Sequence, residues 1–234
     1  MTPGSAPKSP PRPAPAEPFA NYGNAPKQIY ALLRHRILRG ELPGGAKIKI
    51  GAVAGELGVS PIPVREAIRM LAADGLIDVQ PRHSPVVLGV TLAEIYEIGE
   101  IRRWLEPFAL SLAVPQLEEA TLSACQDLID RSRDTTDGWD KVQFNRSFHL
   151  SLYRPCGRGR LLKIIEDQLD GTIRFSRYLV VADELATQAE EDEHQVILDA
   201  CRRRDAEEAT AALTHHLERA LERLTQVWST IDAG

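Results

Sequence analysis

The chain has 234 residues, of which 43% are hydrophobic and 26% charged, which is long enough and apolar enough for a globular protein with a sizeable core. No apolar run approaches the ~20 residues of a membrane-spanning helix. Three scattered cysteines without a Cys-x-x-Cys pair exclude a disulfide framework and a cysteine-built zinc site, and they predict a cytoplasmic location. The net charge of −5 conceals an asymmetry, because residues 27–90 carry nine Lys/Arg against five Asp/Glu, whereas residues 91–234 carry seventeen against twenty-seven. The basic part is therefore expected to meet a polyanion.

The amino-terminal segment, residues 1–26, holds eight of the sixteen prolines and almost nothing that could pack into a core. It also lacks the apolar region of a signal peptide. We therefore expect a disordered tail.

Residues 27–90 follow the order helix, short helix, tight glycine turn, helix and hairpin, which is typical of a winged helix-turn-helix. Apolar residues at helical spacing predict a helix over residues 27–39 and a short one before Gly58, which ends it. Residues 75–90 predict two short strands joined by a turn at Pro81–Pro85. The alternative is a three-helix packing module with no specialised partner.

Two prolines mark the start of the third helix. Ser60 is predicted to cap it, and Pro61 and Pro63 fall in the first turn, where proline loses no helical hydrogen bond. Their rigidity would fix the entry to the helix and leave backbone N–H groups nearby free. Ile68 and Leu71 give this helix a buried side.

Cationic side chains fall where such a domain would meet DNA. Arg65 and Arg69 lie on the third helix, Arg82 and His83 lie at the tip of the hairpin, and Arg34 lies on the polar face of the first helix. These positions favour double-stranded DNA as the partner over the packing module.

The segments "LRHRILRGELPGG" and "ELGVSPIPVREAIRMLAADGLI" resemble the DNA-binding domain of the GntR family of bacterial transcription regulators. The resemblance implies that the start of the third helix faces the DNA and that the hairpin tip enters the minor groove. The residues it implicates are Ser60, Pro61, Ile62, Pro63, Arg65, Arg82 and His83. The chain departs from the family at Pro61, where members often have arginine, so an unusual operator is expected.

From Thr91 onward the pattern predicts helices alone, and therefore an antiparallel helical bundle. Thr91 and Glu94 have the spacing of a capping box at the start of the first of these helices. Further helices are predicted over residues 118–134, 140–153, 159–181, 190–205 and 206–228. The expected fold is mainly α: a winged helix-turn-helix with a small β-hairpin wing, followed by an all-α bundle. The expected domains are residues 27–90 and 91–234.

Polar residues interrupt the apolar stripes of this bundle. Asn145 and His149 are four residues apart and share a helix face, whereas His194 and His216 lie beside core positions on two later helices. Three imidazoles from separate helices could converge on one metal ion, although any one of them could instead be a satisfied buried histidine. His215 is a rival to His216, but its helical phase points outward.

This second part is similar to the FCD branch of the GntR regulators, a helical effector domain that often holds a metal through Asp-x-x-x-His and two later histidines. The matching residues are Asn145, His149, His194 and His216, and the family pattern places Arg102 near the effector cavity. Asn145 stands where many members have aspartate, and an amide oxygen brings no negative charge. Zinc is the expected metal, with nickel or manganese as alternatives. In another arrangement the histidines and Arg102 bind an anionic effector directly.

These features predict a homodimeric, effector-responsive transcription regulator, a repressor whose effector is a small carboxylate. A dimer is expected because one winged helix reads only a short half-site. Effector binding would act through the helix that starts at Thr91, next to the wing. The alternative is a metal-dependent enzyme built on the bundle, for which Glu193 is poorly placed as a general base, since consecutive helical residues point ~100° apart.

Overall fold

The computed structural model describes residues 24–182 and 184–232, so most of the tail expected over residues 1–26 lies outside the described residues. The chain forms two compact units. One contains the described residues before Leu38 together with Pro43–Leu88, and the other contains Leu38–Leu42 and the chain from Gly89 onward. Among the described helices, none is long and apolar enough to cross a lipid bilayer.

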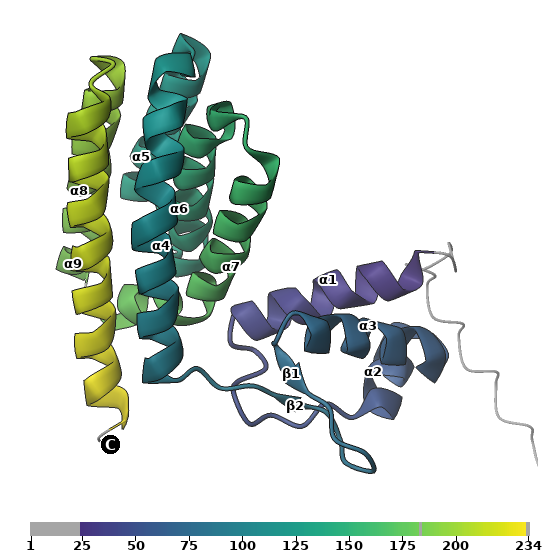
Figure 1. The fold of residues 1–234 in the computed structure, drawn as a ribbon. Coiled ribbons are helices and arrows are strands. Elements are labelled where there is room, and N and C mark those ends of the chain that lie inside the picture. Colours follow the sequence, from purple (N-terminus) through teal and green to yellow (C-terminus); the bar gives the residue numbers. More distant parts are fainter. Residues whose placement is uncertain (1–23, 183, 233–234) are drawn as a thin grey trace, which may run out of the picture. The chain divides into compact units, whose positions relative to one another are not determined.

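The first unit is a three-helix domain with a short hairpin (Figure 1). Its elements are α1 (Ala25–Leu38), α2 (Ile50–Leu57), α3 (Pro61–Ala73), β1 (Ile77–Asp78) and β2 (Val86–Val87). The strands are antiparallel, with Ile77 opposite Val87, and an isolated bridge joins Lys47 to Val86. The winged helix-turn-helix predicted from the sequence is therefore present.

The turn between α2 and α3 follows the prediction except at its cap. Gly58 ends α2 in the left-handed conformation, with a φ of 67° that glycine adopts without strain. Ser60 occupies the N-cap position of α3, but its hydroxyl makes no capping hydrogen bond, so that prediction is wrong. A cap normally binds the N–H of the second or third helical residue, and Pro63 at the third position has none.

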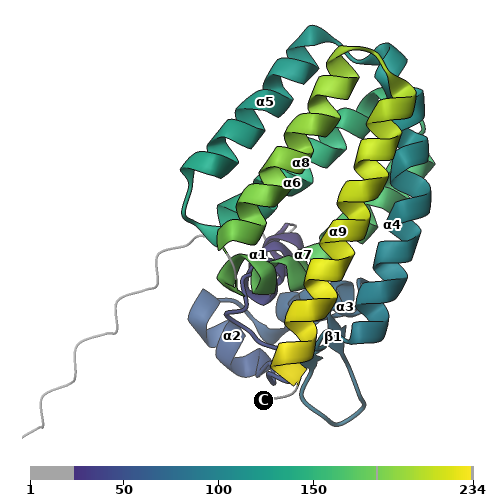
Figure 2. The same cartoon turned by 90° about the vertical axis from the view of Figure 1, so that its left-hand side faces the viewer.

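The second unit is a bundle of long helices that run side by side (Figures 1 and 2). Its helices are α4 (Leu92–Ala113), α5 (Glu119–Asp134), α6 (Gly138–Tyr153), α7 (Gly159–Ala182), α8 (Glu184–Arg202) and α9 (Ala206–Asp232). Single 3-10 turns at Val114–Gln116 and Arg154–Cys156 follow α4 and α6. The all-α prediction is confirmed, although α8 begins before the predicted residue 190, so that His194 lies well inside the helix.

The start of α4 forms half of the predicted capping box. Thr91 Oγ1 accepts a hydrogen bond from the backbone N–H of Glu94 at 3.2 Å. The Glu94 carboxylate does not complete the box, because it instead pairs with Arg174 of α7 at 2.9 Å. Glu94 thus links α4 to α7 instead of accepting a hydrogen bond at the start of its own helix.

An apolar core holds the bundle together, and its buried members come from every helix of this unit. A small set of polar side chains lies within the same interior: Arg102, Glu106, His149, Glu191, His194 and His216. Because burying such groups costs free energy unless they find partners, their arrangement defines the candidate site.

Candidate metal centre and nucleic-acid interface

Three imidazoles from different helices meet inside the bundle. His149 of α6, His194 of α8 and His216 of α9 are all buried, with ring centroids 4.6 to 5.2 Å apart. One ring nitrogen of each lies within 4.8 Å of those of the other two, an arrangement that could hold a metal ion. His215 is exposed, as its helical phase predicts. The convergence expected from the sequence is therefore found.

The protonation state of His149 follows from its neighbours. The Tyr153 hydroxyl donates its one hydrogen to Glu106 Oε2 at 2.7 Å, and the Tyr153 oxygen lies 2.9 Å from His149 Nδ1. Since that hydroxyl hydrogen is already used, Nδ1 of His149 must carry a hydrogen and donate it to Tyr153. The other nitrogen, Nε2, then has a bare lone pair, and it is buried without a hydrogen-bond partner among the described residues.

The same reasoning applies to His216. Its Nδ1 lies 2.8 Å from Glu193 Oε2, and an ionised carboxylate can only accept, so Nδ1 is the donor. Burial opposes the charge on Glu193, but hydrogen bonds from His216 and Arg223 outweigh it and lower the carboxyl pKa to about 2. Glu193 was expected to point away from the site, but it contacts the cluster through His216. Its carboxylate is engaged by His216 and Arg223, so it orients a histidine and is not a free general base.

Two of the three rings, those of His149 and His194, are held in the neutral form. Burial first, and the neighbouring imidazoles second, lower the pKa values of His149 and His194 well below the usual range. The Nε2 atom of His194 is also buried and without a hydrogen-bond partner in the described part of the chain. Neutral imidazoles with inward lone pairs suit a metal cation, and they do not supply the positive charge that direct binding of an anion by the histidines would need.

Arg102 lies beside the cluster but is already paired. Its Nε and Nη2 donate to the two oxygens of Glu106, one turn further along α4, at 2.5 and 3.3 Å. Arg102 also lines a cavity next to the cluster, and its role in binding an effector stays a prediction. Tyr153 was not identified from the sequence, although its position four residues after His149 was an available signal.

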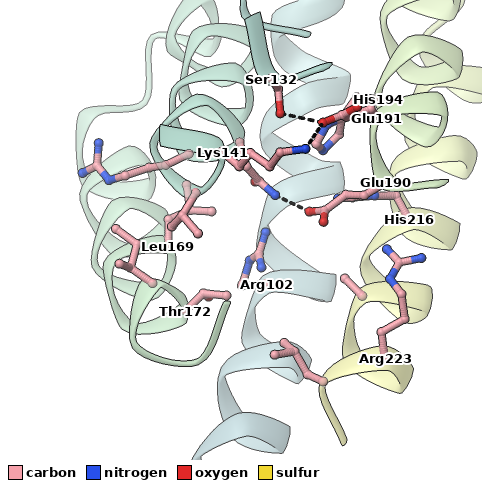
Figure 3. Close-up of a pocket in the computed structure, with 16 residues that line it drawn as sticks. Arg102, Ser132, Lys141, Leu169, Thr172, Glu190, Glu191, His194, His216 and Arg223 are labelled. Carbon is pink, nitrogen blue, oxygen red and sulfur yellow. Dashed lines mark hydrogen bonds and ion pairs between the residues drawn. The ribbon is translucent and has the colours of Figure 1, made fainter. Parts of the chain in front are cut away.

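A cavity that is open to solvent lies next to the imidazoles (Figure 3). His194 and His216 form part of its wall, and four cationic side chains also line it: Arg102, Lys141, Arg146 and Arg223. A ligand in it would therefore have direct access to the imidazole cluster.

Asn145, predicted as a ligand, lies on the cavity wall half-buried, one turn before His149. Its amide nitrogen donates a hydrogen bond to the carboxylate of Glu190 on α8. Glu190 was missed in the sequence, where it reads as the first of four consecutive acidic residues.

The residues predicted to bind DNA lie mainly on the exposed side of the first unit. The exposed members are Ser60, Pro61, Ile62, Arg65, Arg69, Arg82 and His83, whereas Pro63 and Arg34 are half-buried. Ile62 is 70% exposed, which is unusual for a large apolar side chain and suits contact with a base methyl group. Arg69 forms an ion pair with Glu66 at 2.6 Å, so part of its charge is neutralised within the helix.

Comparison with known proteins covers both units. Residues 26–87 match the model of bacterial regulatory proteins of the gntR family, and residues 97–219 match that of the FCD domain. The chain is 26% identical to the uncharacterized HTH-type transcriptional regulator YdhC of Bacillus subtilis, over 86% of this chain and 91% of that protein. It is 25% identical to the HTH-type transcriptional repressor GlaR of Escherichia coli, over 80% of this chain and 90% of that protein.

A solved structure shows the same arrangement of elements. Escherichia coli McbR/YncC superposes with a TM-score of 0.76 and 25% identity, over 87% of this chain and 98% of that one. These relatives are transcription regulators and not enzymes, so the alternative of a metal-dependent enzyme finds no support.

Proposed function

Because this chain belongs to the GntR family of bacterial transcription regulators and carries an FCD domain, we propose that it is a repressor governed by a bound metal and a small carboxylate metabolite. The first unit binds operator DNA, and the second senses the effector. The observation that carries the proposal is the buried cluster of three imidazoles beside a cavity, in which the Nε2 atoms of His149 and His194 have no hydrogen-bond partner among the described residues. As a DNA-binding regulator it would act in the bacterial cytoplasm.

The metal supported best by this cluster is zinc. His149, His194 and His216 offer three neutral nitrogens, a set that zinc accepts readily, with nickel and manganese as alternatives. When bound, such an ion would supply positive charge and open coordination positions to a ligand in the cavity. The chain's own contribution is orientation, because Tyr153 and Glu193 hold two of the rings in the required tautomer.

The charge balance of the cavity supports a carboxylate effector that depends on the metal. Each lining cation already has a carboxylate partner: Arg102 with Glu106, Lys141 with Glu191, Arg146 with Asp170, and Arg223 with Glu193. A bound divalent ion would therefore add positive charge that these pairs do not neutralise. A small organic acid would be attracted to that charge and could form further hydrogen bonds with the arginines.

Arg174 connects the helix that lines the cavity with the segment that follows the wing, and it could therefore transmit the effect of a ligand. Thr172 and Ile173 of α7 line the cavity, and the next residue, Arg174, is buried. Its guanidinium donates to Glu94 at the start of α4 and to the carbonyl oxygen of Gly89, at 2.9 and 2.8 Å. Gly89 follows strand β2 closely in the chain, so a displacement of α7 by ligand would be passed to this connection.

A homodimer is proposed on the ground that a single recognition helix reads only a short half-site. The helical unit has a surface that could form the dimer interface, because α4 exposes apolar side chains that are separated by four residues or by a multiple of four. They are Leu92, Tyr96, Trp104 and Phe108, which are 39%, 47%, 73% and 56% exposed. A second copy of the chain is the partner that would cover this α4 stripe.

The test is operator binding measured with and without the two ligands. DNA from the promoter regions near the gene would be titrated with metal-free protein, with zinc-loaded protein, and with zinc plus a panel of small carboxylates. For a repressor of this kind, one carboxylate changes the affinity for operator DNA, and it does so only when zinc is present. If neither zinc nor any carboxylate of the panel changes operator affinity, the proposed regulation is wrong, but the binding of DNA is not.

A further inference from the structure

The cavity wall contains a carboxylate that the histidine cluster does not yet use. Glu190 lies on α8 one helical turn before His194, as Asn145 lies on α6 one turn before His149. Each helix thus carries one pair, Asn145 with His149 and Glu190 with His194. The Asn145 amide donates a hydrogen bond to Glu190, and the rings of His149 and His194 are 5.1 Å apart. The Glu190 carboxylate is thus on the same side of α8 as a cluster imidazole, and Figure 3 shows it directed into the cavity, although its oxygens lie outside the group of ligand atoms that are within 4.8 Å of one another.

The other nearby acidic side chains are already neutralised. Glu191 accepts a hydrogen bond from Ser132 at 2.8 Å and pairs with Lys141, and Glu193 accepts from His216 and Arg223. Glu190, in contrast, has no ion pair with a cation among the described residues, and its charge interacts with Arg102 and Arg223 only at longer range. Only its Oε1 has a hydrogen-bond donor within that part of the chain, the neutral amide of Asn145. One carboxylate oxygen therefore remains for another partner.

A metal at this position needs an anionic ligand. Three neutral imidazoles leave the full charge of a divalent ion inside the protein, and Asn145 cannot reduce it. Arg102 and Arg223 also line the same cavity, but Glu106 and Glu193 are already engaged with them, so these two carboxylates are not available to compensate the ion. A carboxylate beside the ion would remove half of its charge.

We propose that Glu190 is the anionic ligand of the ion held by His149, His194 and His216, and that Asn145 is a positioning residue which donates to Glu190 Oε1 and leaves Oε2 for the metal. The carboxylate that a metal site needs would then come from α8 and not from α6. This inference rests on the proposed metal site and assigns Glu190 and Asn145 their roles within it.

The experiment is a zinc titration of the full-length protein, first freed of metal and then followed by competition with a chromophoric chelator. Glu190→Gln keeps the size of the side chain and removes its charge, and it should weaken zinc binding by at least ten- to a hundredfold. The matched control is Asp192→Asn, two residues away on α8, which removes the same charge from an exposed ion pair with Arg133 and should leave zinc affinity unchanged. Asn145→Ala should cost less than Glu190→Gln, because it removes only the residue that positions the ligand.

A double variant separates loss of charge from structural damage. Asn145→Asp combined with Glu190→Gln returns a carboxylate to the neighbouring helix and should restore most of the zinc affinity. Thermal unfolding of each metal-free variant checks that the fold is intact. If the double variant folds but stays weak, the missing charge does not explain the loss and the inference is wrong.

The two proposals fail in different ways. If the unmodified protein binds no zinc, the proposed metal site itself is wrong. If it binds zinc and Glu190→Gln binds equally well, the site stands but Glu190 is not a ligand. A large loss in Asn145→Ala alone would make the Asn145 amide oxygen the ligand and would overturn the role assigned to Glu190.

Discussion

The Tyr153 hydroxyl lies 2.9 Å from His149 Nδ1, and both side chains are fully buried. Through Tyr153 the imidazole is connected to Glu106, which in turn is held by Arg102. This chain of hydrogen bonds fixes which nitrogen of His149 carries the hydrogen and leaves Nε2 with the free lone pair. Tyr153 is therefore expected to control the ability of the cluster to bind a metal.

Tyr153→Phe therefore tests the chain of hydrogen bonds directly. The change leaves the Nδ1–H of His149 and one oxygen of Glu106 without their partner, which should reduce the free energy of unfolding by ~1–3 kcal/mol. It should also weaken zinc binding by about tenfold or more, since His149 loses its fixed tautomer. Urea unfolding and zinc titration measure the two effects. Tyr30→Phe, which removes a hydroxyl that donates to Asp74 in the first unit, is the control, and a Tyr153→Phe protein that matches it in both measurements would refute the orienting role.

The neutral histidines predict a dependence of stability on pH in the metal-free protein. In the unfolded chain His149 and His194 take up protons near pH 6.5, whereas their lowered pKa values keep them neutral in the fold. The unfolded state therefore binds more protons at acidic pH, and the stability present above pH ~6.5 falls as the pH drops below it. Each group contributes on the order of 1 kcal/mol per pH unit in that range.

Chemical unfolding between pH 5 and 8 measures this loss. His194→Gln should flatten the decline between pH ~6.5 and 5, whereas His215→Gln, which changes an exposed ring, should not. Glu193 contributes little in this range, because its stabilising effect is lost only as the pH falls from its ordinary pKa of 4.5 towards its folded value of about 2. An unchanged slope in His194→Gln would show that this imidazole is not held neutral.

In the DNA-binding unit, Arg65 is the side chain whose loss should matter most. It is exposed near the start of α3, beside Ile62, and a direct contact with a base edge would make Arg65→Ala cost ~1–3 kcal/mol of operator affinity. Fluorescence anisotropy with labelled operator gives the affinity. Arg160→Ala removes the same charge from an exposed site on α7 and serves as the control. Equal losses in the two variants would indicate a general effect of charge.

Arg174 is expected to carry the response from the cavity. Arg174→Gln loses the paired contacts with Glu94 and Gly89, so ligand should still bind while its effect on operator affinity shrinks. Zinc affinity and operator affinity are measured separately, each with and without the active carboxylate. Retention of the full effector response by a folded Arg174→Gln protein would exclude this route.

The four consecutive acidic residues at the middle of α8 show where prediction from the sequence stops. Each points about 100° from the last, so each finds a different partner: Glu190 meets Asn145, Glu191 meets Lys141, Asp192 meets Arg133 and Glu193 meets His216. The sequence shows only a charged run, typical of a solvated surface. Which acid faces the cavity is decided by the packing of α6 and α9 against α8.

Features with a local cause were predictable. The periodic apolar stripes predict the helices, the glycine at position 58 predicts the turn, and helical phase separates buried His216 from exposed His215. The Ser60 cap failed because Pro63 removes one of the N–H groups that it would bind. Contacts between helices, such as those of Tyr153 with Glu106, depend on tertiary structure that spacing alone does not specify.

The α4 stripe predicts how the chain associates. Trp104 is 73% exposed, and burying it against a second copy would make it a major contributor to the interface. Trp104→Glu should weaken the dimer by roughly 2 kcal/mol or more, because it both removes the apolar contact and places like charges near the two-fold axis. Analytical ultracentrifugation over a range of concentrations measures the shift towards monomer. Val196→Glu, which alters a 53% exposed apolar residue on α8, should leave the dimer intact, and a dimer that tolerates Trp104→Glu as well would place the interface elsewhere on the molecule.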